Sequence, residues 1–160
     1  MRLNFFQIHS KNDKIQKKLA GGIRQTKDGT LEAIAIDKDL QEDARKITFN
    51  SQSRYQFNTT DSLNLSHYDK GGVYFQMRKD DSSHQLKISI EKISVDMTSL
   101  VHSMQIGKWT DVYIPFHCFK NKELDMRSLK KVFTLEKKEG SVSMANIKLL
   151  KNSQGDGFCE

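Results

Sequence analysis

The chain has 160 residues, of which 36% are hydrophobic and 29% are charged, and its net charge is +6 at pH 7. This length predicts one domain with a sizeable core, because a chain of about 150 residues buries roughly 70% of its unfolded surface. No apolar run approaches the ~20 residues of a membrane-spanning helix, and the apolar start is too short for a signal peptide, so we expect no membrane partner.

The positive charge is concentrated at the start of the chain. Residues 1–27 carry seven basic residues and one acidic residue, and the remaining chain carries 19 of each sign. A basic segment can attract anionic partners, but a solvated polar segment is the simpler interpretation, and we expect no nucleic-acid partner. We predict a basic N-terminal segment over residues 1–30 that is partly ordered onto the domain.

Short segments that alternate apolar and polar residues follow in chain order, which is the pattern of half-buried strands. The predicted strands are 31–36, 44–50, 51–60, 73–78 and 86–91. We expect 44–50 and 51–60 to form a hairpin through Asn50–Ser53. The segment 95–101 is expected to be a short strand or a loop.

The stretch Trp109–Phe119, WTDVYIPFHCF, contains the only Trp and the only Pro of the chain. Val112 and Ile114 alternate with polar residues, which predicts a strand, and Pro115 should close that strand or lie on a sheet edge. Because Trp109 directly precedes this apolar alternation, we predict that its indole is buried in the core.

The C-terminal part of the chain continues the β pattern after one interruption. KNKELDMRSLKK (120–131) has helical tendency, and we predict one short helix near 122–130. Two strands are expected over 132–150, joined across Lys138–Ser141, and the tail 152–160 is predicted to be flexible. About eight to ten short strands separated by turn signals indicate an all-β sandwich or barrel.

The sequence carries no recognisable catalytic or cofactor motif. A glycine-rich phosphate loop, a nucleophile elbow and zinc-type Cys/His spacing are all missing. His117 and Cys118 are adjacent, and adjacent residues of a strand point to opposite faces, so they should not form a catalytic pair. Cys118 and Cys159 could form a disulfide, but the pattern favours Cys118 as a small buried hydrophobic residue.

The outward side of the central strands carries aromatic and hydrogen-bonding residues. If these strands pair in one sheet, period-two alternation puts these aromatic and hydrogen-bonding residues on one face, opposite the apolar core residues. A tyrosine ring can stack on a sugar while amides and charges bind its hydroxyls, although an ordinary solvated face has the same pattern. The candidate carbohydrate-binding residues are Tyr74, Gln76, Arg78, Lys87, Glu91 and Tyr113.

An acidic cluster near the start of the second predicted strand is the nearest candidate for a structural Ca²⁺ site, which would need about six to eight oxygen ligands. A solvated acidic loop is the preferred interpretation, and we expect no cofactor. The candidate ligands are Asp37, Asp39, Glu42 and Asp43.

Two stretches carry a family resemblance: DKDLQEDARKITFN (37–50), and WTDVYIPFHCF followed by a spacer and VFTLEKKEGSVSMANIKLL. With them the chain resembles the C-terminal galactose-binding-like domain of bacterial family 3 glycoside hydrolases of the exo-1,3/1,4-β-glucanase and β-glucosidase type. The resemblance implies a jelly-roll β-sandwich over residues 31–151. A departure is the segment 84–100, where many members carry a cysteine-rich insertion and this chain has no cysteine.

The resemblance also implies a function without catalysis, because the catalytic carboxylates of these enzymes lie in other domains. We therefore expect a non-catalytic carbohydrate-binding accessory module, with a β-glucan or another polysaccharide and the catalytic domains of a family 3 glycoside hydrolase as partners. The alternative is a structural module that packs on a catalytic domain or mediates dimerisation without binding sugar. As part of such an enzyme the domain would be periplasmic or extracellular, and without a signal peptide in this chain the cytoplasm stays open as an alternative.

Overall fold

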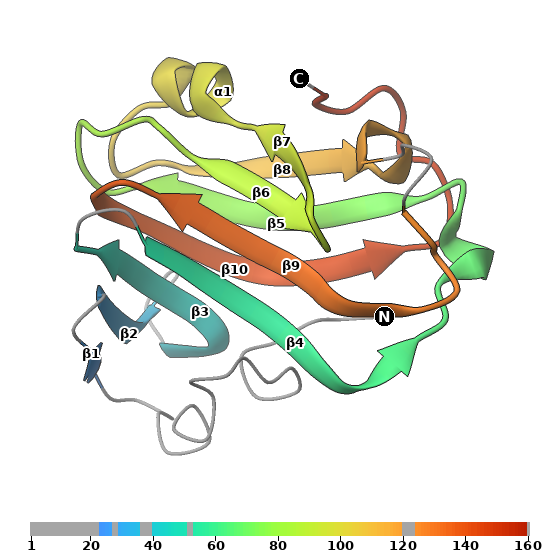
Figure 1. The fold of residues 1–160 in the computed structure, drawn as a ribbon. Coiled ribbons are helices and arrows are strands. Elements are labelled where there is room, and N and C mark those ends of the chain that lie inside the picture. Colours follow the sequence, from blue (N-terminus) through green and yellow to red (C-terminus); the bar gives the residue numbers. More distant parts are fainter. Residues whose placement is uncertain (1–22, 27–28, 36–39, 51–52, 120–123, 160) are drawn as a thin grey trace.

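Two antiparallel β-sheets stacked face to face form the domain (Figure 1). The computed structural model describes residues 23–26, 29–35, 40–50, 53–119 and 124–159. Sheet A has the strand order β1 (Ile23–Thr26), β2 (Gly29–Ala35), β3 (Leu40–Phe49), β10 (Gly140–Leu150), β5 (Gly72–Lys79) and β8 (Trp109–Pro115). Sheet B has the order β4 (Ser53–Leu63), β9 (Leu129–Lys137), β6 (Lys87–Ile90) and β7 (Ile93–Asp96). The predicted all-β sandwich is confirmed.

The core lies between the two sheets and is built from the inward residues of each strand. Val73, Phe75 and Met77 of β5 are completely buried, as period-two alternation predicts. The ring of Phe75 meets that of Phe133 on β9 edge to face at 5.6 Å, which joins the sheets across the middle of the core. Such aromatic pairs contribute about 0.5–1.5 kcal/mol beyond their buried area.

Consecutive strands often lie in different sheets rather than in hairpins. β3 is in sheet A and β4 in sheet B, so the hairpin predicted through Asn50–Ser53 is wrong, and residues 51–52 of that connection lie outside the described residues. β9 and β10 are two strands, as predicted, but they also lie in opposite sheets. An alternating pattern identifies the buried face of a strand, and it is the same whether the next strand pairs beside it or packs across the core.

Helical structure is short and lies elsewhere than predicted. The helix expected near 122–130 is absent from residues 124–130, where Asp125 accepts hydrogen bonds from the backbone N–H and the guanidinium of Arg127, both at 3.0 Å. This local bond competes with helix formation, and β9 begins at Leu129. Among the described residues, the helices are η2 (Ser66–Tyr68), α1 (Thr98–Ser103) and η3 (Phe116–Phe119). Within the described part of the chain, no helix is long and apolar enough to span a membrane.

A β-bulge interrupts β10 where it pairs with β5. The register shifts between Ala145 and Lys148, so that β10 has one residue more than its partner there. Asn146 lies in the bulge with φ 53°, a conformation that Asn tolerates better than most residues. The bulge changes which residues face the core: Val142 and Met144 are buried before it, and Ile147 and Leu149 after it. It therefore directs Lys148 outward, next to β5.

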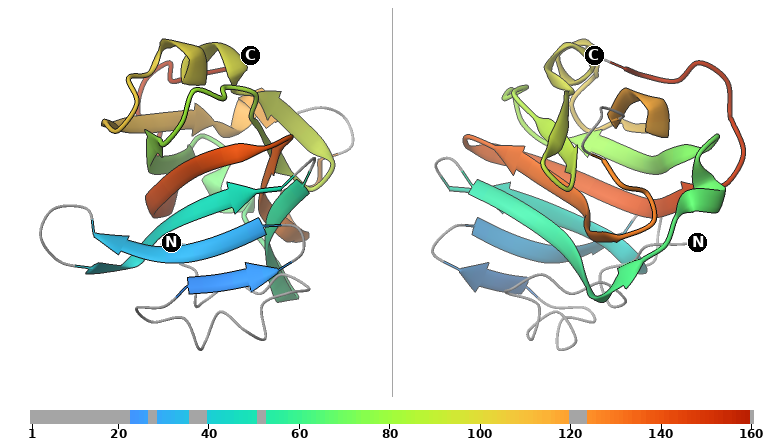
Figure 2. Two further views of the ribbon diagram at one scale, coloured as in Figure 1. Left: turned by 90° about the vertical axis from the view of Figure 1, so that its left-hand side faces the viewer. Right: turned by 45° about the vertical axis from the view of Figure 1, so that its right-hand side comes forward.

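The segment after β10 returns along the outer edge of sheet A. The backbone N–H of Phe158 donates to the carbonyl of Tyr113 on β8 at 2.8 Å, and the Phe158 side chain packs against the core cluster. We call residues 152–159 the tail. Both views in Figure 2 place the tail (red) and α1 on the side of the domain opposite β1 and β2 (blue). The sequence predicted a flexible tail over 152–160 and contained no sign of these contacts.

Candidate functional site

The outward side of β5 and β8 carries most of the predicted site residues. The register pairs Tyr74 with Tyr113, Gln76 with Asp111 and Arg78 with Trp109. In alternation with these pairs, Val73 pairs with Ile114 and Phe75 with Val112, and all four are buried. Four of the six predicted site residues, Tyr74, Gln76, Arg78 and Tyr113, lie on this face, as alternation predicted. We call the surface formed by Tyr74, Gln76, Arg78, Trp109, Asp111 and the adjoining Asn146 and Lys148 of β10 the polar face.

A line of hydrogen bonds crosses three strands at the centre of the polar face. Asn146 donates to the side-chain oxygen of Gln76, and Gln76 Nε2 donates to Asp111 Oδ1 at 3.4 Å. The hydroxyl of Tyr74 also donates to Asp111 Oδ1, at 3.2 Å. Because each partner fixes the next, these side chains are held in defined positions before any ligand binds, which lowers the entropic cost of binding.

The protonation state of this centre suits hydrogen bonding. Burial raises the pKa of Tyr74 above its ordinary value of 10.0, and the charge and the hydrogen bond of Asp111 raise it further. The phenol therefore stays protonated at neutral pH and donates to the carboxylate. The ammonium of Lys148 lies 5.7 Å from the centre of the Tyr74 ring, a cation–π contact across the bulge of β10.

Trp109 forms one end of the polar face, and its predicted burial in the core is wrong. Its indole is half-buried on the outward side of sheet A, with the guanidinium of Arg78 at 5.3 Å from the ring centre. Arg78 is held in turn by Asp80 at 2.5 Å and by Ser143 at 3.1 Å. The reason is parity: if Val112 and Ile114 face inward, the odd-numbered residues of this strand face outward. The alternation in the sequence therefore already indicates an outward position for Trp109.

Tyr113 lies on the same side of sheet A, but its ring is covered. A Cβ atom on Gly72 would lie 2.6 Å from Tyr113 Cε2, and one on Gly157 would lie 2.7 Å from Tyr113 Cδ1. The ring therefore fits between a glycine of β5 and a glycine of the tail. Its hydroxyl is buried without a hydrogen-bond partner among the described residues. Tyr113 holds the tail, and the uncovered part of the polar face lies at Tyr74, Gln76 and Trp109.

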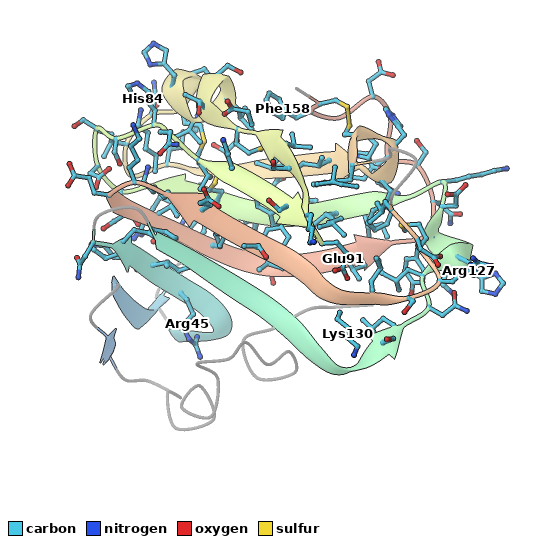
Figure 3. The ribbon with its side chains drawn as sticks, viewed as in Figure 1. Arg45, His84, Glu91, Arg127, Lys130 and Phe158 are labelled. Atoms are coloured by element: carbon cyan, nitrogen blue, oxygen red, sulfur yellow. A yellow bond between two sulfur atoms is a disulfide. The ribbon has the colours of Figure 1, made fainter. Side chains whose placement is uncertain are left out.

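Lys87 and Glu91 do not share a face with the other predicted site residues. β6, which begins with Lys87, pairs with β7 and β9 in sheet B, so the assumption that β5 and β6 are neighbours is wrong. Glu91 follows β6, and its carboxylate accepts the backbone N–H of Lys130 at 2.6 Å (Figure 3). Both residues belong to the opposite sheet because the chain crosses the core between β5 and β6.

The predicted calcium ligands lie outside the part of the chain whose side chains are described. Asp37 and Asp39 are outside the described residues, and Glu42 and Asp43 lie on β3 with side chains that are not described. Calcium binding at this cluster stays a prediction.

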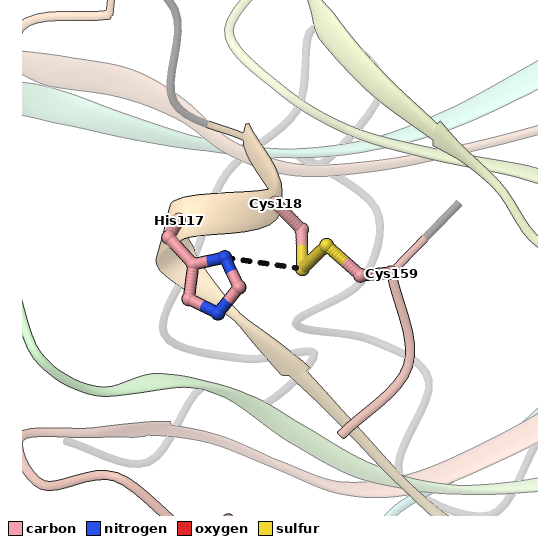
Figure 4. Close-up of side chains that lie close together, drawn as sticks. All are labelled: His117, Cys118 and Cys159. Carbon is pink, nitrogen blue, oxygen red and sulfur yellow. Dashed lines mark hydrogen bonds between the residues drawn. A yellow bond between two sulfur atoms is a disulfide. The ribbon is translucent and has the colours of Figure 1, made fainter. Parts of the chain in front are cut away.

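Cys118 and Cys159 form a disulfide, so the expectation that Cys118 is an unpaired buried residue is wrong (Figure 4). Cys118 lies on η3 and Cys159 near the end of the tail, with Cα atoms 5.4 Å apart. Nδ1 of the exposed His117 lies 4.0 Å from Cys118 Sγ. The sequence does not reveal this disulfide, because nothing local to Cys159 indicates that Phe158 anchors the tail beside η3.

A second polar cluster closes the end of the sandwich near α1. Asp81 accepts hydrogen bonds from the backbone N–H of Ser83 at 3.0 Å and from that of Ser141 at 2.7 Å. Burial alone would raise the pKa of Asp81, but these bonds, the Ser83 hydroxyl and the Lys137 charge outweigh burial and lower it below 3.8. The adjoining cavity of about 10 Å³ is large enough for a single water molecule at most, so it cannot hold a sugar.

Comparison with known proteins identifies the fold. The family model Exop_C, described as galactose-binding domain-like, matches residues 6–149. No curated protein matches the chain. One similar structure is the extra C-terminal domain (X) of the exo-1,3/1,4-β-glucanase ExoP from a Pseudoalteromonas species, with a TM-score of 0.69 and 16% identity over 88% of this chain and 82% of that one. In the structure of ExoP itself, the match covers 18% of the ExoP chain.

Another similar structure is the family 30 carbohydrate-binding module of the cellulosomal cellulase Cel9D-Cel44B of Clostridium thermocellum. Its TM-score is 0.59, with 13% identity over 86% of this chain and 89% of that one. At these identities the likeness establishes the fold alone. The family match also agrees with the prediction that this chain is a non-catalytic domain.

Proposed function

Because the chain belongs to the Exop_C family of galactose-binding-like domains, we propose that it is a carbohydrate-binding accessory module that binds a polysaccharide on the polar face of sheet A. The proposal rests on one observation above the others. A fixed line of hydrogen-bonding groups, Asn146, Gln76 and Asp111, lies between two aromatic rings, those of Tyr74 and Trp109.

This arrangement matches the chemistry of a sugar chain. A pyranose ring has an apolar side that packs on an aromatic ring and a rim of hydroxyls that exchange hydrogen bonds with amides and carboxylates. Trp109 pairs with Arg78, which is four residues from Tyr74 along β5, so the backbone positions of the two aromatic residues are about 13 Å apart along the strand direction. Such a span fits several sugar units of an extended chain better than a monosaccharide.

The proposed ligand is a β-glucan, and the proposed partner is the catalytic domain of a family 3 glycoside hydrolase. Support comes from the ExoP domain, which is part of an exo-1,3/1,4-β-glucanase, and from the resemblance in residues 37–50 and 109–150. In that setting the domain would act outside the cytoplasm. Binding should be weak, because an open face buries less of its ligand than a deep pocket does.

Affinity electrophoresis in gels containing soluble β-1,3- or mixed-linkage β-1,3/1,4-glucan tests the proposal. We expect the native chain to be retarded, and Tyr74→Ala and Trp109→Ala each to lose most of this retardation. Lys87→Ala is the matched control, because Lys87 is exposed on sheet B, and it should migrate as the native chain does.

The outcomes separate the candidate functions. Retardation that persists in both aromatic variants would place any sugar site elsewhere and refute the polar face. Retardation lost in the Lys87 variant alone would favour sheet B. No retardation by any soluble glucan or galactan would favour the alternative, a structural module that packs on a catalytic domain without binding sugar.

A further inference from the structure

We propose that reduction of the Cys118–Cys159 disulfide converts this corner of the domain into a Zn²⁺ site formed by His117, Cys118 and Cys159. Their ligand atoms, Nδ1 and the two Sγ atoms, all lie within 4.8 Å of one another (Figure 4). In the oxidised protein the sulfurs are bonded to each other and cannot act as thiolate ligands. The site is therefore a property of the reduced protein.

The geometry requires only a small rearrangement. Zn²⁺ binds thiolate sulfur at about 2.3 Å and imidazole nitrogen at about 2.0–2.1 Å, so two sulfurs on one tetrahedral ion lie about 3.8 Å apart. Breaking the S–S bond lets the sulfurs separate to that distance, while the Nδ1–Sγ distance shortens slightly from 4.0 Å. A water molecule would take the fourth position. Two thiolates and an imidazole favour Zn²⁺ over Ca²⁺ or Mg²⁺.

Contacts independent of the disulfide keep the ligands near one another after reduction. The N–H of Phe158 still donates to the Tyr113 carbonyl, and its side chain still packs on the core cluster. Cys118 and His117 are fixed by η3, whose Phe116 and Phe119 are buried. His117 and Cys159 are exposed, so both a reductant and a metal ion can reach the site.

The chemistry balances with a reductant of the dithiol or phosphine class. A dithiol gives two electrons to the S–S bond, each sulfur takes up a proton, and the dithiol becomes a cyclic disulfide. With a phosphine, water supplies the oxygen of the phosphine oxide. Zn²⁺ then replaces the two thiol protons, which are released to solvent, so affinity should fall as the pH is lowered.

The test is titration of the full chain with Co²⁺ and Zn²⁺ after phosphine reduction and removal of oxygen. We expect one metal ion per chain, a thiolate-to-cobalt charge-transfer band, and displacement of Co²⁺ by Zn²⁺. The oxidised chain should show none of these. In the reduced chain, Zn²⁺ should also raise the hydrogen-exchange protection of the Phe158 amide above that of the metal-free reduced chain, because the metal ties Cys159 to η3.

Variants test whether the metal binds at His117 and the two cysteines or at the contact between His84 and His102. His117→Ala should weaken binding by about tenfold or more, since even changes in residues that only support ligands have effects of this size, and Cys159→Ser should remove the charge-transfer band. His84→Ala is the control: its ring packs edge to face on His102 at 4.8 Å, and His84 is not one of the three ligand residues. The proposal is overturned by equal uptake in the oxidised chain, by no uptake or loss of fold on reduction, or by weakening in the His84 variant.

Discussion

Replacing Cys159 with Ser removes the disulfide and leaves the tail held by the contacts of Phe158 and by the packing of Gly157 on Tyr113. In the unfolded chain the bond closes a loop across a sequence separation of 41, which the chain-entropy relation values at about 4 kcal/mol at 25 °C. In the folded protein the bond closes only the segment between Leu150, where β10 ends, and Cys159. The same relation gives about 2.6 kcal/mol for that shorter loop.

The difference of about 1.4 kcal/mol is the expected loss in unfolding free energy if the reduced tail moves freely. The contacts of Phe158 hold the tail in part, because its backbone hydrogen bond contributes about 1 kcal/mol and its partly buried ring adds to this. Because these contacts keep the tail ordered without the disulfide, the loss in unfolding free energy should be closer to the full value of about 4 kcal/mol. We therefore expect a loss of about 2–3 kcal/mol, or roughly 4–12 °C in Tm for a chain of this size.

Urea unfolding of both proteins, followed by circular dichroism and by Trp109 fluorescence, measures this loss. Reductant should bring the native chain to the stability of the variant and leave the variant unchanged. Gln154→Ala, an exposed change in the tail, should stay within about 0.5 kcal/mol of the native chain. A Cys159→Ser variant as stable as the native chain, or a loss well above about 4 kcal/mol, would refute the loop argument.

Two further predictions concern the polar face and the end of the sandwich. Trp109→Ala should cost about 1–3 kcal/mol of stability because it truncates a half-buried surface ring, whereas Phe133→Ala should cost about 3–5 kcal/mol because it opens a cavity in the core. Equal losses in urea unfolding would contradict the outward position of Trp109. The lowered pKa of Asp81 makes a stabilising contribution that is fully present above the unfolded-state pKa near 3.8 and is lost as the pH falls through the lower folded-state value. Thermal unfolding at successively lower pH should therefore show a steeper loss for the native chain than for Asp81→Asn, and parallel profiles would argue against this role.

The fold class could be predicted because alternation is local, whereas the sheet partners could not. Val73, Phe75 and Ile88 face the core as the pattern indicated. The pattern does not indicate whether β6 pairs with β5 in one sheet or packs against it across the core, since both arrangements bury the same residues. That choice depends on long-range contacts such as the one between Phe75 and Phe133.

The same distinction explains which residues of the candidate site could be predicted. Tyr74, Gln76 and Arg78 were found because they share one strand, and their parity needs no knowledge of neighbours. Lys87 and Glu91 were predicted on the wrong sheet, because β6 pairs in sheet B rather than with β5. Asn146 and Lys148 were missed because the bulge reverses parity within β10, and no local signal in SMANIKLL marks the extra residue.

The same bulge affects how related sequences should be aligned. A relative that lacks one residue between Ala145 and Lys148 would keep an unbroken ladder with β5, and its apolar positions would run in uniform alternation through the strand. Aligned without a gap, such a relative would show apolar residues opposite Lys148 and polar residues opposite Leu149, which would look like divergence of the site. A one-residue gap placed at Asn146 restores the correspondence, so the length of this strand should be compared before its residues are.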